Sequence, residues 1–543
     1  MPSIGGQDLV NDDGTTPRLS RRSFLGALPV AAIVAACSSA PGGATHNVLD
    51  HGALGNGIHD DAGAIGRAVE KLKSGDTLRF PQGTYRFALQ NPAGGAAISL
   101  RGLSNVAIEF ESGAELLMDN LDQNGLGTSH GVVVRGPASG VSLRGVVVRW
   151  TTQPSERSMG DGIRIVGYPS ESREVPGDWT GSMGPVSGVT LRNCSIRSSP
   201  QAGVIMMGVS DIAVTDLQVQ DTLADGLHFN ACRDGEVKDY VATNTGDDGL
   251  ALVTYHANED AFDNNAETFS LSELTEWSDA DLTVNNVVVN GSNANGVRLA
   301  GANRVTLTDI KVQGVRSGAG VIIDSAAPGS DAEWDYLASR AIKVQGLVVD
   351  ESDSGFHVLA RPNGSTDDRF SRFDLDASDV TVRSCPRWSV LVESVADEPV
   401  TGVRLRDCTV STRAVDTETG IVGLQTTQGV SLGKFIIDCT EPAIAFSANN
   451  STEFELDELR VSVSGPGPDP GSAEPLALFQ DSAGTVASVQ MSWPQAPSPW
   501  TPISVDGAAC NDSPDAGDSP VRISRLTTTP SAAVIAAADE GCR

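Results

Sequence analysis

The stretch from 224 to 252 reads ADGLHFNACRDGEVKDYVATNTGDDGLAL and carries one short motif twice. Segments 225–227 and 248–250 both read DGL, and alternating apolar residues follow each glycine. The offset between Asp225 and Asp248 is 248 − 225 = 23 residues, and a further aspartate, Asp247, precedes the later motif. If 23 residues make one turn of a repeating structure, these carboxylates lie side by side although they are distant in sequence.

A small or acidic residue followed by glycine recurs along the chain and supports this period. The glycines are Gly162, Gly203, Gly226, Gly249, Gly296 and Gly320. From the second glycine onward the intervals are 226 − 203 = 23, 249 − 226 = 23, 296 − 249 = 47 and 320 − 296 = 24. We interpret the interval of 47 as one period with an insertion, because segment 254–279 is rich in Asn, Asp and Glu.

A second strand repeats in the same phase. Segments 189–196, 212–219, 282–289, 305–312, 342–349, 380–387 and 403–410 each alternate apolar and polar residues. A single strand cannot bury its apolar face, whereas stacked repeats of about 20–25 residues can. The chain is therefore predicted to be all-β, a right-handed parallel β-helix with rungs of about 23 residues.

The segment 48–87 predicts how the stack begins. Asp60 or Asp61 can cap a helix whose apolar residues recur at helical spacing until Gly75, and a strand follows at 77–80. This segment resembles the helix and first strand that cap pectate-lyase-like parallel β-helix proteins. We expect the β-helix domain at 46–464 and a less regular C-terminal cap or appendage at 465–543.

The N-terminus has the pattern of a targeting segment. SRRSFL at 20–25 matches the twin-arginine motif, and VAAC at 34–37 resembles a lipobox, so residues 1–37 are predicted to be a twin-arginine lipoprotein signal peptide. Cys37 would then be lipidated and residues 38–45 would be a linker. The alternative is an ordinary cleaved signal peptide. We expect a protein exported by the twin-arginine pathway, which is lipid-anchored to the cell envelope or extracellular.

The composition indicates which classes of binding partner are unfavourable for this protein. A formal charge of −31 disfavours nucleic acid, and it disfavours a strongly anionic polysaccharide unless a local basic cluster offsets the repulsion. No C-x-x-C or His cluster indicates a metal, so no cofactor is expected. Cys194, Cys385 and Cys408 are interpreted as interior or turn residues, with a disulfide between Cys385 and Cys408 on adjacent rungs as the alternative. A disulfide between residues 510 and 542 could hold the tail.

The insertions follow the glycine-led strand and are expected to wall a groove along one edge of the stack. They cover 168–184, 254–279, 324–338 and 361–373. Three of them carry a tryptophan, namely Trp179, Trp277 and Trp334. An exposed indole is a good surface for stacking a sugar ring, whereas a buried indole would anchor its own loop.

Asp225, Asp247 and Asp248 have the chemistry of a glycoside hydrolase. Neighbouring strands lie about 4.8 Å apart, so the three carboxylates should be close and one should hold a proton. A carboxylic acid can then protonate the leaving oxygen while a carboxylate activates water. The structural alternative is that aspartates at rung turns only cap the amides of the next rung.

At these residues the sequence resembles the polygalacturonases and, more closely, the bacterial α-1,3-glucanases (mycodextranases). The resemblance implies inversion, with Asp247 as general acid and Asp225 and Asp248 holding the water. One rung further on, segment 295–298 reads NGVR where polygalacturonases have Gly-His-Gly, and no Arg-Ile-Lys follows. These departures favour a neutral glycan over galacturonan.

The preferred hypothesis is thus a glycoside hydrolase that cleaves a polysaccharide, expected as a monomer that meets the membrane only through its lipid anchor. The candidate substrate-binding residues are His228, Asn295, Arg298, Trp277 and Trp334. One alternative is a polysaccharide lyase that holds Ca²⁺ and uses Arg164, Arg298 or Arg316 as base. The other alternative is a non-catalytic glycan-binding β-helix, which predicts that the three aspartates are splayed apart.

Overall fold

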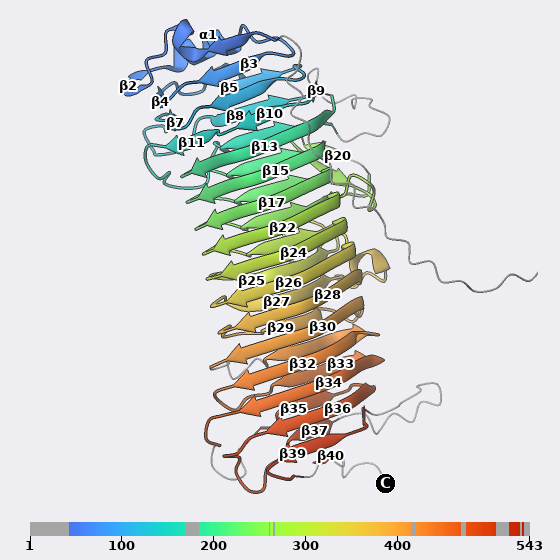
Figure 1. The fold of residues 1–543 in the computed structure, drawn as a ribbon. Helices are drawn as coiled ribbons and strands as arrows, with labels where there is room; N and C mark the ends of the chain where they lie inside the picture. The colour runs from blue at the N-terminus through green and yellow to red at the C-terminus, as the bar shows by residue number, and fades with distance from the viewer. Residues whose placement is uncertain are drawn as a thin grey trace, which may run out of the picture. The chain divides into compact units, whose positions relative to one another are not determined.

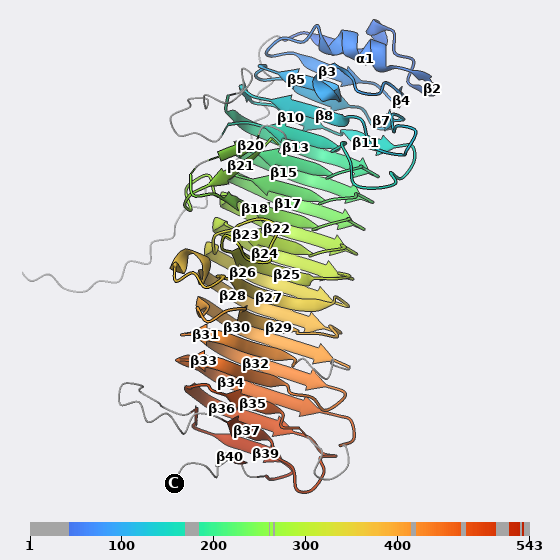
Figure 2. The same ribbon diagram turned by 180° about the vertical axis from the view of Figure 1, so that it is seen from behind.

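The computed structural model describes residues 43–168, 184–259, 261–263, 267–413, 420–467, 474–506, 521–532 and 535–536. Parallel strands dominate this part of the chain and stack rung upon rung (Figure 1). Two sheets run along the stack, here called the long-strand sheet and the short-strand sheet, and Figure 2 shows both from behind. The prediction of a parallel β-helix is confirmed.

The first strands of the long-strand sheet are β1 (Thr45–Asn47), β2 (Asn56–Asp60), β3 (Thr77–Phe80), β4 (Gly83–Phe87), β6 (Ala107–Phe110), β7 (Ala114–Met118), β9 (Ala138–Ser139), β10 (Ser142–Arg144) and β11 (Val147–Trp150). The later ones are β13 (Val186–Arg197), β15 (Val209–Gln220), β17 (Arg233–Thr243), β22 (Ala280–Asn290), β24 (Asn303–Gln313), β26 (Arg340–Asp350), β28 (Arg372–Arg383), β30 (Thr401–Thr412), β32 (Ser431–Cys439), β34 (Phe454–Val463), β36 (Gly484–Ser492), β38 (Arg522–Ile523) and β39 (Leu526–Thr529).

The short-strand sheet contains β5 (Ala96–Arg101), β8 (His130–Arg135), β12 (Ile163–Val166), β14 (Val204–Met207), β16 (Leu227–Asn230), β18 (Leu250–Val253), β23 (Val297–Ala300), β25 (Ala319–Ala326), β27 (Ser354–Arg361), β29 (Val390–Ser394), β31 (Val422–Gln428), β33 (Phe446–Thr452), β35 (Ala477–Gln480), β37 (Ile503–Asp506) and β40 (Ile535–Ala536). A separate small sheet contains β19 (Tyr255–His256), β20 (Ala261–Asp263) and β21 (Thr268–Leu271).

The register of the short-strand sheet sets the site. Val204 pairs with Leu227 and Leu227 pairs with Leu250, so both offsets are 23 residues (227 − 204 and 250 − 227). Leu250 then pairs with Val297, an offset of 47 (297 − 250), because segment 254–279 leaves the rung and contains the small sheet. This interval is therefore one rung with an insertion.

The repeated glycine exists because the two sheets approach each other closely. A Cβ atom on Gly226 would lie 2.2 Å from the hydroxyl of Tyr240, and one on Gly249 would lie 2.4 Å from Cγ1 of Val289. Tyr240 and Val289 belong to the long-strand sheet, and both are buried. Any side chain larger than hydrogen would therefore push the sheets apart, which explains a motif that the sequence shows only as a period.

Polar residues inside the long strands make the bends of each rung. Asp216, Asp239, Asn286 and Asp309 recur in neighbouring strands, and their φ angles are 54°, 56°, 54° and 55°. Asp and Asn adopt this left-handed conformation more readily than other residues with side chains. The amide of Asn286 also donates to Asp239 Oδ1 at 2.6 Å, so side chains tie these rungs together.

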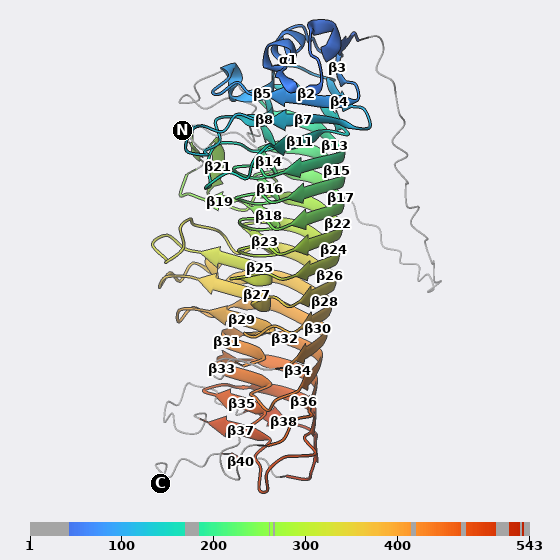
Figure 3. The same ribbon diagram turned by 90° about the vertical axis from the view of Figure 1, so that its left-hand side faces the viewer.

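The α-helix α1 (Ala62–Val69) lies at the N-terminal end of the stack (Figure 3). Ile65 and Ala68 are fully buried on its apolar face. At its start the carboxylate of Asp60 accepts the N–H of Ala62, while Asp61 instead accepts the N–H groups of Leu54 and Gly55. The 3₁₀ helices are η1 (Val48–His51), η2 (Ala93–Gly95) and η3 (Asp368–Phe370). In the part of the chain that the structure describes, no helix has the length and apolar character needed to cross a membrane.

Two expectations about the C-terminal half are corrected. The stack does not become irregular at 465, since β35, β36 and β37 continue the parallel pairing of β33 and β34. Cys385 and Cys408 do not stack either, because Cys408 pairs with Val380 and the rung is lengthened between β29 and β30. Both cysteines are free and buried, as are Cys194, Cys232 and Cys439, so their interpretation as interior residues holds. Residues 1–42, Trp179, Cys510 and Cys542 lie outside the described residues.

Candidate active site

A cavity of about 1060 Å³ lies along the short-strand sheet, and Asp225, Asp247 and Asp248 line it. Three of the predicted insertions contribute to its wall, and Arg361 is the contribution of segment 361–373. Tyr255, Glu267 and Thr268 come from segment 254–279, and Ala332, Glu333, Trp334 and Tyr336 come from segment 324–338. The groove expected from the sequence is thus present beside the aspartates.

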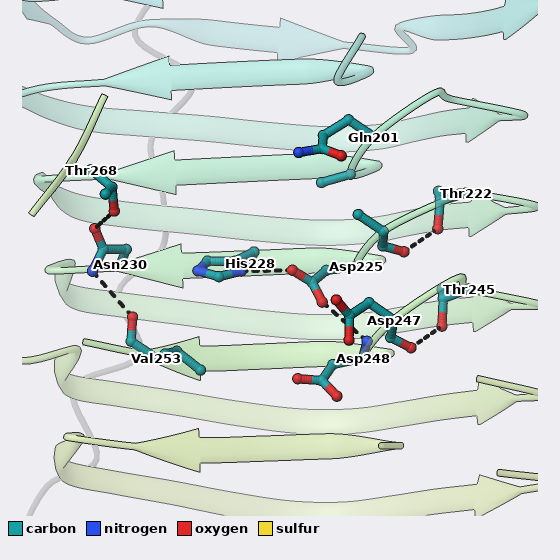
Figure 4. A network of polar contacts seen from close by, with 12 residues as sticks. Gln201, Thr222, Asp225, His228, Asn230, Thr245, Asp247, Asp248, Val253 and Thr268 are labelled. Atoms are coloured by element: carbon teal, nitrogen blue, oxygen red, sulfur yellow. Dashed lines mark hydrogen bonds and ion pairs between the residues drawn. The ribbon is translucent and has the colours of Figure 1, made fainter. Parts of the chain in front are cut away.

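One carboxylate oxygen from each of Asp225, Asp247 and Asp248 lies within 4.8 Å of the other two. Figure 4 shows the three side chains converging at the start of β16 and β18. The backbone explains the geometry, because Asp225 and Asp248 precede equivalent strands on consecutive rungs. The sequence predicted this convergence, and the arrangement with splayed aspartates is excluded.

Asp225 and Asp248 also belong to a ladder of side chains that cap the next rung. Asp225 Oδ1 accepts the N–H of Asp248 at 3.0 Å, and Asp248 Oδ1 accepts the N–H of Asn295 at 3.0 Å. Asn295 Oδ1 in turn accepts the N–H of Ala319 at 3.0 Å. The capping of the next rung, which the sequence suggested as the structural alternative, is therefore present. It occupies Oδ1 of Asp225 and Oδ1 of Asp248.

The second oxygen of Asp225 is bound by His228. Asp225 Oδ2 lies 2.7 Å from Nδ1 of His228 on β16, and both side chains are buried and line the cavity (Figure 4). Burial alone would raise the pKa of Asp225. The hydrogen bond and charge of His228, together with the charge of Arg157, hold the pKa of this carboxyl below its usual range. Asp225 is the ionised member of the triad.

Arg157 is a site residue that the sequence did not indicate. Its Nη1 donates to Asp247 Oδ2 at 3.0 Å and its Nε donates to Gln201 Oε1 at 2.8 Å. Its segment is fixed nearby, where the N–H of Ser158 donates to the carbonyl of Pro200 at 2.9 Å. Arg157 and Asp247 are 90 residues apart in sequence, so no local pattern could have paired them.

Asp247 and Asp248 both have raised pKa values, which favour the protonated form. Burial and the negative charge of Asp225 raise the pKa of Asp248 to about 7, against the opposing charge of Arg298. Burial and the charge of Asp225 also raise the pKa of Asp247, against the opposing effect of Arg157. Three carboxylates this close cannot all be ionised without a large cost, so the triad holds a proton near neutral pH.

The cavity arginines are paired with buried acids. Arg298 donates to Asp324 from Nε at 3.0 Å and from Nη2 at 2.8 Å, and Arg361 donates to the same carboxylate at 2.9 Å. Toward the other end of the cavity, Arg164 contacts Asp161 at 2.9 Å and Glu267 at 3.1 Å. Arg316, the third candidate of the lyase hypothesis, is not among the described residues that line the cavity; it donates to Asn244.

The two described tryptophans of the insertions have different positions. Trp334 is 43% exposed, lines the cavity and contacts Tyr255 with 5.1 Å between ring centroids. The expectation for Trp277 is corrected, since it is only 6% exposed and lies under Arg233, whose Cζ is 4.3 Å from the ring centroid. It anchors its own loop and is not among the described residues that line the cavity.

Asn295 also differs from its expected role. It is not among the described residues that line the cavity, and its amide Nδ2 donates to Asp248 Oδ1 at 2.8 Å. Asn295 therefore positions a carboxylate. His228 and Arg298, in contrast, both line the cavity.

The separation between the acid and base carboxyl groups distinguishes inverting from retaining enzymes. Acid and base are about 6.5–9.5 Å apart in most inverting enzymes and about 5–5.5 Å apart in retaining ones. The bound of 4.8 Å joins one oxygen of each residue, whereas the criterion compares whole carboxyl groups, so inversion stays a prediction. The same three carboxylates form the one group among the described residues that could hold a metal ion. Hard oxygen ligands of this type suit Ca²⁺, but His228, Arg157 and Asn295 already bind one oxygen of each.

No protein-family model matches the sequence, and no curated protein matches it. Among solved structures, the chain is similar to the catalytic unit of a thermostable GH87 α-1,3-glucanase from Streptomyces thermodiastaticus strain HF3-3, with 17% identity, a TM-score of 0.48, and coverage of 89% of this chain and 69% of that one. It is also similar to the Yersinia enterocolitica family 28 exopolygalacturonase, with 12% identity, a TM-score of 0.48, and coverage of 82% and 78%.

A third similar structure is the A-module of a mannuronan C-5 epimerase from Azotobacter vinelandii. Its identity is 13%, its TM-score is 0.41, and the match covers 90% of this chain and all of the module. The two families that the sequence resembles are thus found among the similar structures.

Proposed function

We propose that this protein is a glycoside hydrolase that cleaves a polysaccharide with the triad of Asp225, Asp247 and Asp248. The observation that carries the proposal is that three carboxylates, with pKa values displaced in opposite directions, lie together on one cavity. Glycoside hydrolysis needs such a pair of states, a protonated carboxyl to release the leaving group and an ionised one to activate water or attack.

The roles follow from burial and partners. Asp247 is the most accessible of the three and is proposed to donate the proton to the glycosidic oxygen. Asp225 is held ionised by His228 and is proposed to act with Asp248 on the water. In each turnover Asp247 gives one proton to the leaving oxygen and the base takes one from the attacking water, and transfer of that proton between the neighbouring carboxyl groups restores the acid. Inversion remains a prediction, which the anomer of the first product, followed by NMR, would test.

The chemistry of the cavity arginines argues against the lyase alternative. A lyase would need an arginine that accepts a proton, and it must therefore become neutral. The carboxylate of Asp324 instead raises the pKa of Arg298, and the carboxylates of Asp161 and Glu267 raise the pKa of Arg164, although burial opposes both shifts. We therefore propose hydrolysis without a metal. Full activity in EDTA supports this, and calcium dependence with unsaturated products would support the lyase.

Substrate and cellular location are proposals from the sequence. A neutral glycan is favoured by the departures from the polygalacturonase pattern, and the exposed Trp334 offers a stacking surface for an uncharged ring. Export by the twin-arginine pathway, lipidation of Cys37 and a monomeric state complete the proposal. Radiolabelled palmitate incorporation in wild type and in Cys37→Ala tests the anchor.

The decisive experiment is reducing-end release from a panel of polysaccharides by wild type, Asp225→Asn, Asp247→Asn and Asp248→Asn. Each variant should lose about 10²- to 10⁴-fold in kcat, the usual contribution of a general acid or base. Asp216→Asn is the matched control, because Asp216 is exposed on the long-strand sheet and Asn accepts its φ of 54°. If all three triad variants cleave every hydrolysed substrate like wild type, the proposed function is wrong.

A further inference from the structure

Trp388 lies in the same column of residues as the catalytic aspartates. Beyond Asp248, successive rungs place Asn295, Ala319, Ser354 and then Trp388 at the equivalent position before the strand. The inter-rung backbone hydrogen bond found at the other residues of this column is also present at Trp388, whose carbonyl accepts the N–H of Gly355 at 2.9 Å. Four rung steps of about 4.8 Å put Trp388 about 19 Å from Asp248 along the stack.

The indole of Trp388 lies against the outer face of the short-strand sheet. A Cβ atom on Gly423 would lie 2.6 Å from Cζ3 of Trp388, and one on Gly420 would lie 2.7 Å from the same atom. Gly423 faces outward, because its neighbours Val422 and Leu424 are buried in the core. Two glycines thus leave room for a half-buried ring on a surface where other rungs carry side chains.

The outer face connects this ring with the cavity. His228, Ala251 and Arg298 line the cavity and pair laterally in that order. The same lateral row continues through Ile322, His357 and Leu391 to Gly423. The row therefore runs from His228 in the cavity to Gly423, against which the indole of Trp388 lies. Within it Ile322 and Leu391 are buried, whereas His357 is half-buried.

We propose that Trp388 is a distal sugar-binding platform, on which a polysaccharide that leaves the cavity along the outer face of the short-strand sheet stacks one of its rings. The proposal rests on the proposed function, because the bound chain is the polysaccharide being cleaved. An indole offers an apolar face to the C–H groups of a sugar ring. The hydrogen bond between His357 Nε2 and Glu393 Oε1, 2.9 Å long, lies on the same face and supplies polar partners for hydroxyl groups.

The test compares a long and a short substrate with the same linkage. In Trp388→Ala, kcat/KM on the polymer should fall about five- to ten-fold, the range of one aromatic stacking contact. On a disaccharide or trisaccharide, which occupies only the cavity, kcat/KM should change by less than two-fold. Val395→Ala is the control, because Val395 is exposed on the next turn of chain after β29 and has no part in the row.

Gly423→Ala is the second variant, since its methyl group displaces the indole without removing it. It should also lower polymer activity more than activity on the short substrate, and Trp388→Phe should restore most of the polymer activity. Equal losses on both substrates, or no loss on either, would overturn the proposal. If the protein cleaves no glycan, its retardation during electrophoresis in gels that contain the polysaccharide still tests the sugar-binding platform separately from the hydrolase proposal. Weaker retardation of Trp388→Ala would support the platform while the hydrolase proposal fails, and unchanged retardation would overturn the platform.

Discussion

Asp225 Oδ1 accepts the backbone N–H of Asp248 across consecutive rungs at 3.0 Å. The same two residues that are proposed to hold the water thus also fix the register of their strands. The bond keeps the carboxyl groups close and leaves Asp225 Oδ2 for His228. The strand register and the proposed chemistry therefore both depend on this hydrogen bond. Variants of the residues around it separate the structural role of the two aspartates from their catalytic role.

Replacing His228 should move the acidic limb of the pH–rate profile to higher pH. The hydrogen bond and charge of His228 lower the pKa of Asp225, so their loss raises it and the base is ionised only at higher pH. In His228→Phe we expect a shift of about one pH unit. His228→Gln, which keeps a donor but no charge, should shift the limb less. A lower rate with an unmoved limb would mean that His228 has only a structural role.

Replacing Arg157 should move the alkaline limb in the same direction. Arg157 lowers the pKa of Asp247 through its charge and its hydrogen bond, so Arg157→Gln lets the acid keep its proton to higher pH. The measurement is kcat/KM against pH on one substrate. Arg304→Gln is the control, because Arg304 forms a comparable ion pair with Asp281 at 2.7 Å on the long-strand sheet. An alkaline limb that stays in place would remove Asp247 from the acid role.

The two tryptophans should give opposite phenotypes. Trp334→Ala removes an exposed ring at the cavity and should raise KM several-fold, while the melting temperature changes little. Trp277→Ala removes a buried ring and should cost about 3–5 kcal/mol of stability, with KM unchanged in the folded fraction. Thermal melts and steady-state kinetics on both variants check this. A raised KM in Trp277→Ala alone would return Trp277 to the substrate-binding residues.

Asp279 should make stability depend on pH. It is fully buried, its Oδ1 accepts the N–H of Cys232, and burial raises its pKa from 3.8 to about 7. The folded state therefore keeps a proton that the unfolded state releases, so the free energy of unfolding falls as pH rises from about 4 to about 7. The full loss is on the order of 4 kcal/mol.

Asp279→Asn, which cannot ionise, should remove this slope and be more stable than wild type at pH 8. Urea unfolding at pH 5 and pH 8 measures the difference. The control is Asp281→Asn, an exposed neighbour whose Arg304 pair lowers its pKa. Parallel stability curves for wild type and Asp279→Asn would contradict the assignment of a buried proton.

The sequence by itself determined the fold class and the centre of the site, because both depend on local periodic features. Alternating apolar residues, a glycine where the sheets touch, and Asp or Asn at left-handed bends recur with the rung, so Asp225 and Asp248 had to be neighbours. The same period failed for Cys385 and Cys408, because a longer connection between β29 and β30 changed the count.

Only the tertiary structure decided which other side chains reach the aspartates. Arg157 meets Asp247 from a segment 90 residues away, and of two similar tryptophans Trp334 faces the cavity while Trp277 turns inward. The path of an insertion depends on what it packs against, which no short-range pattern encodes. The pKa values follow from the same long-range contacts, since burial and neighbouring charges make Asp225 the ionised carboxylate and leave the proton to Asp247 and Asp248.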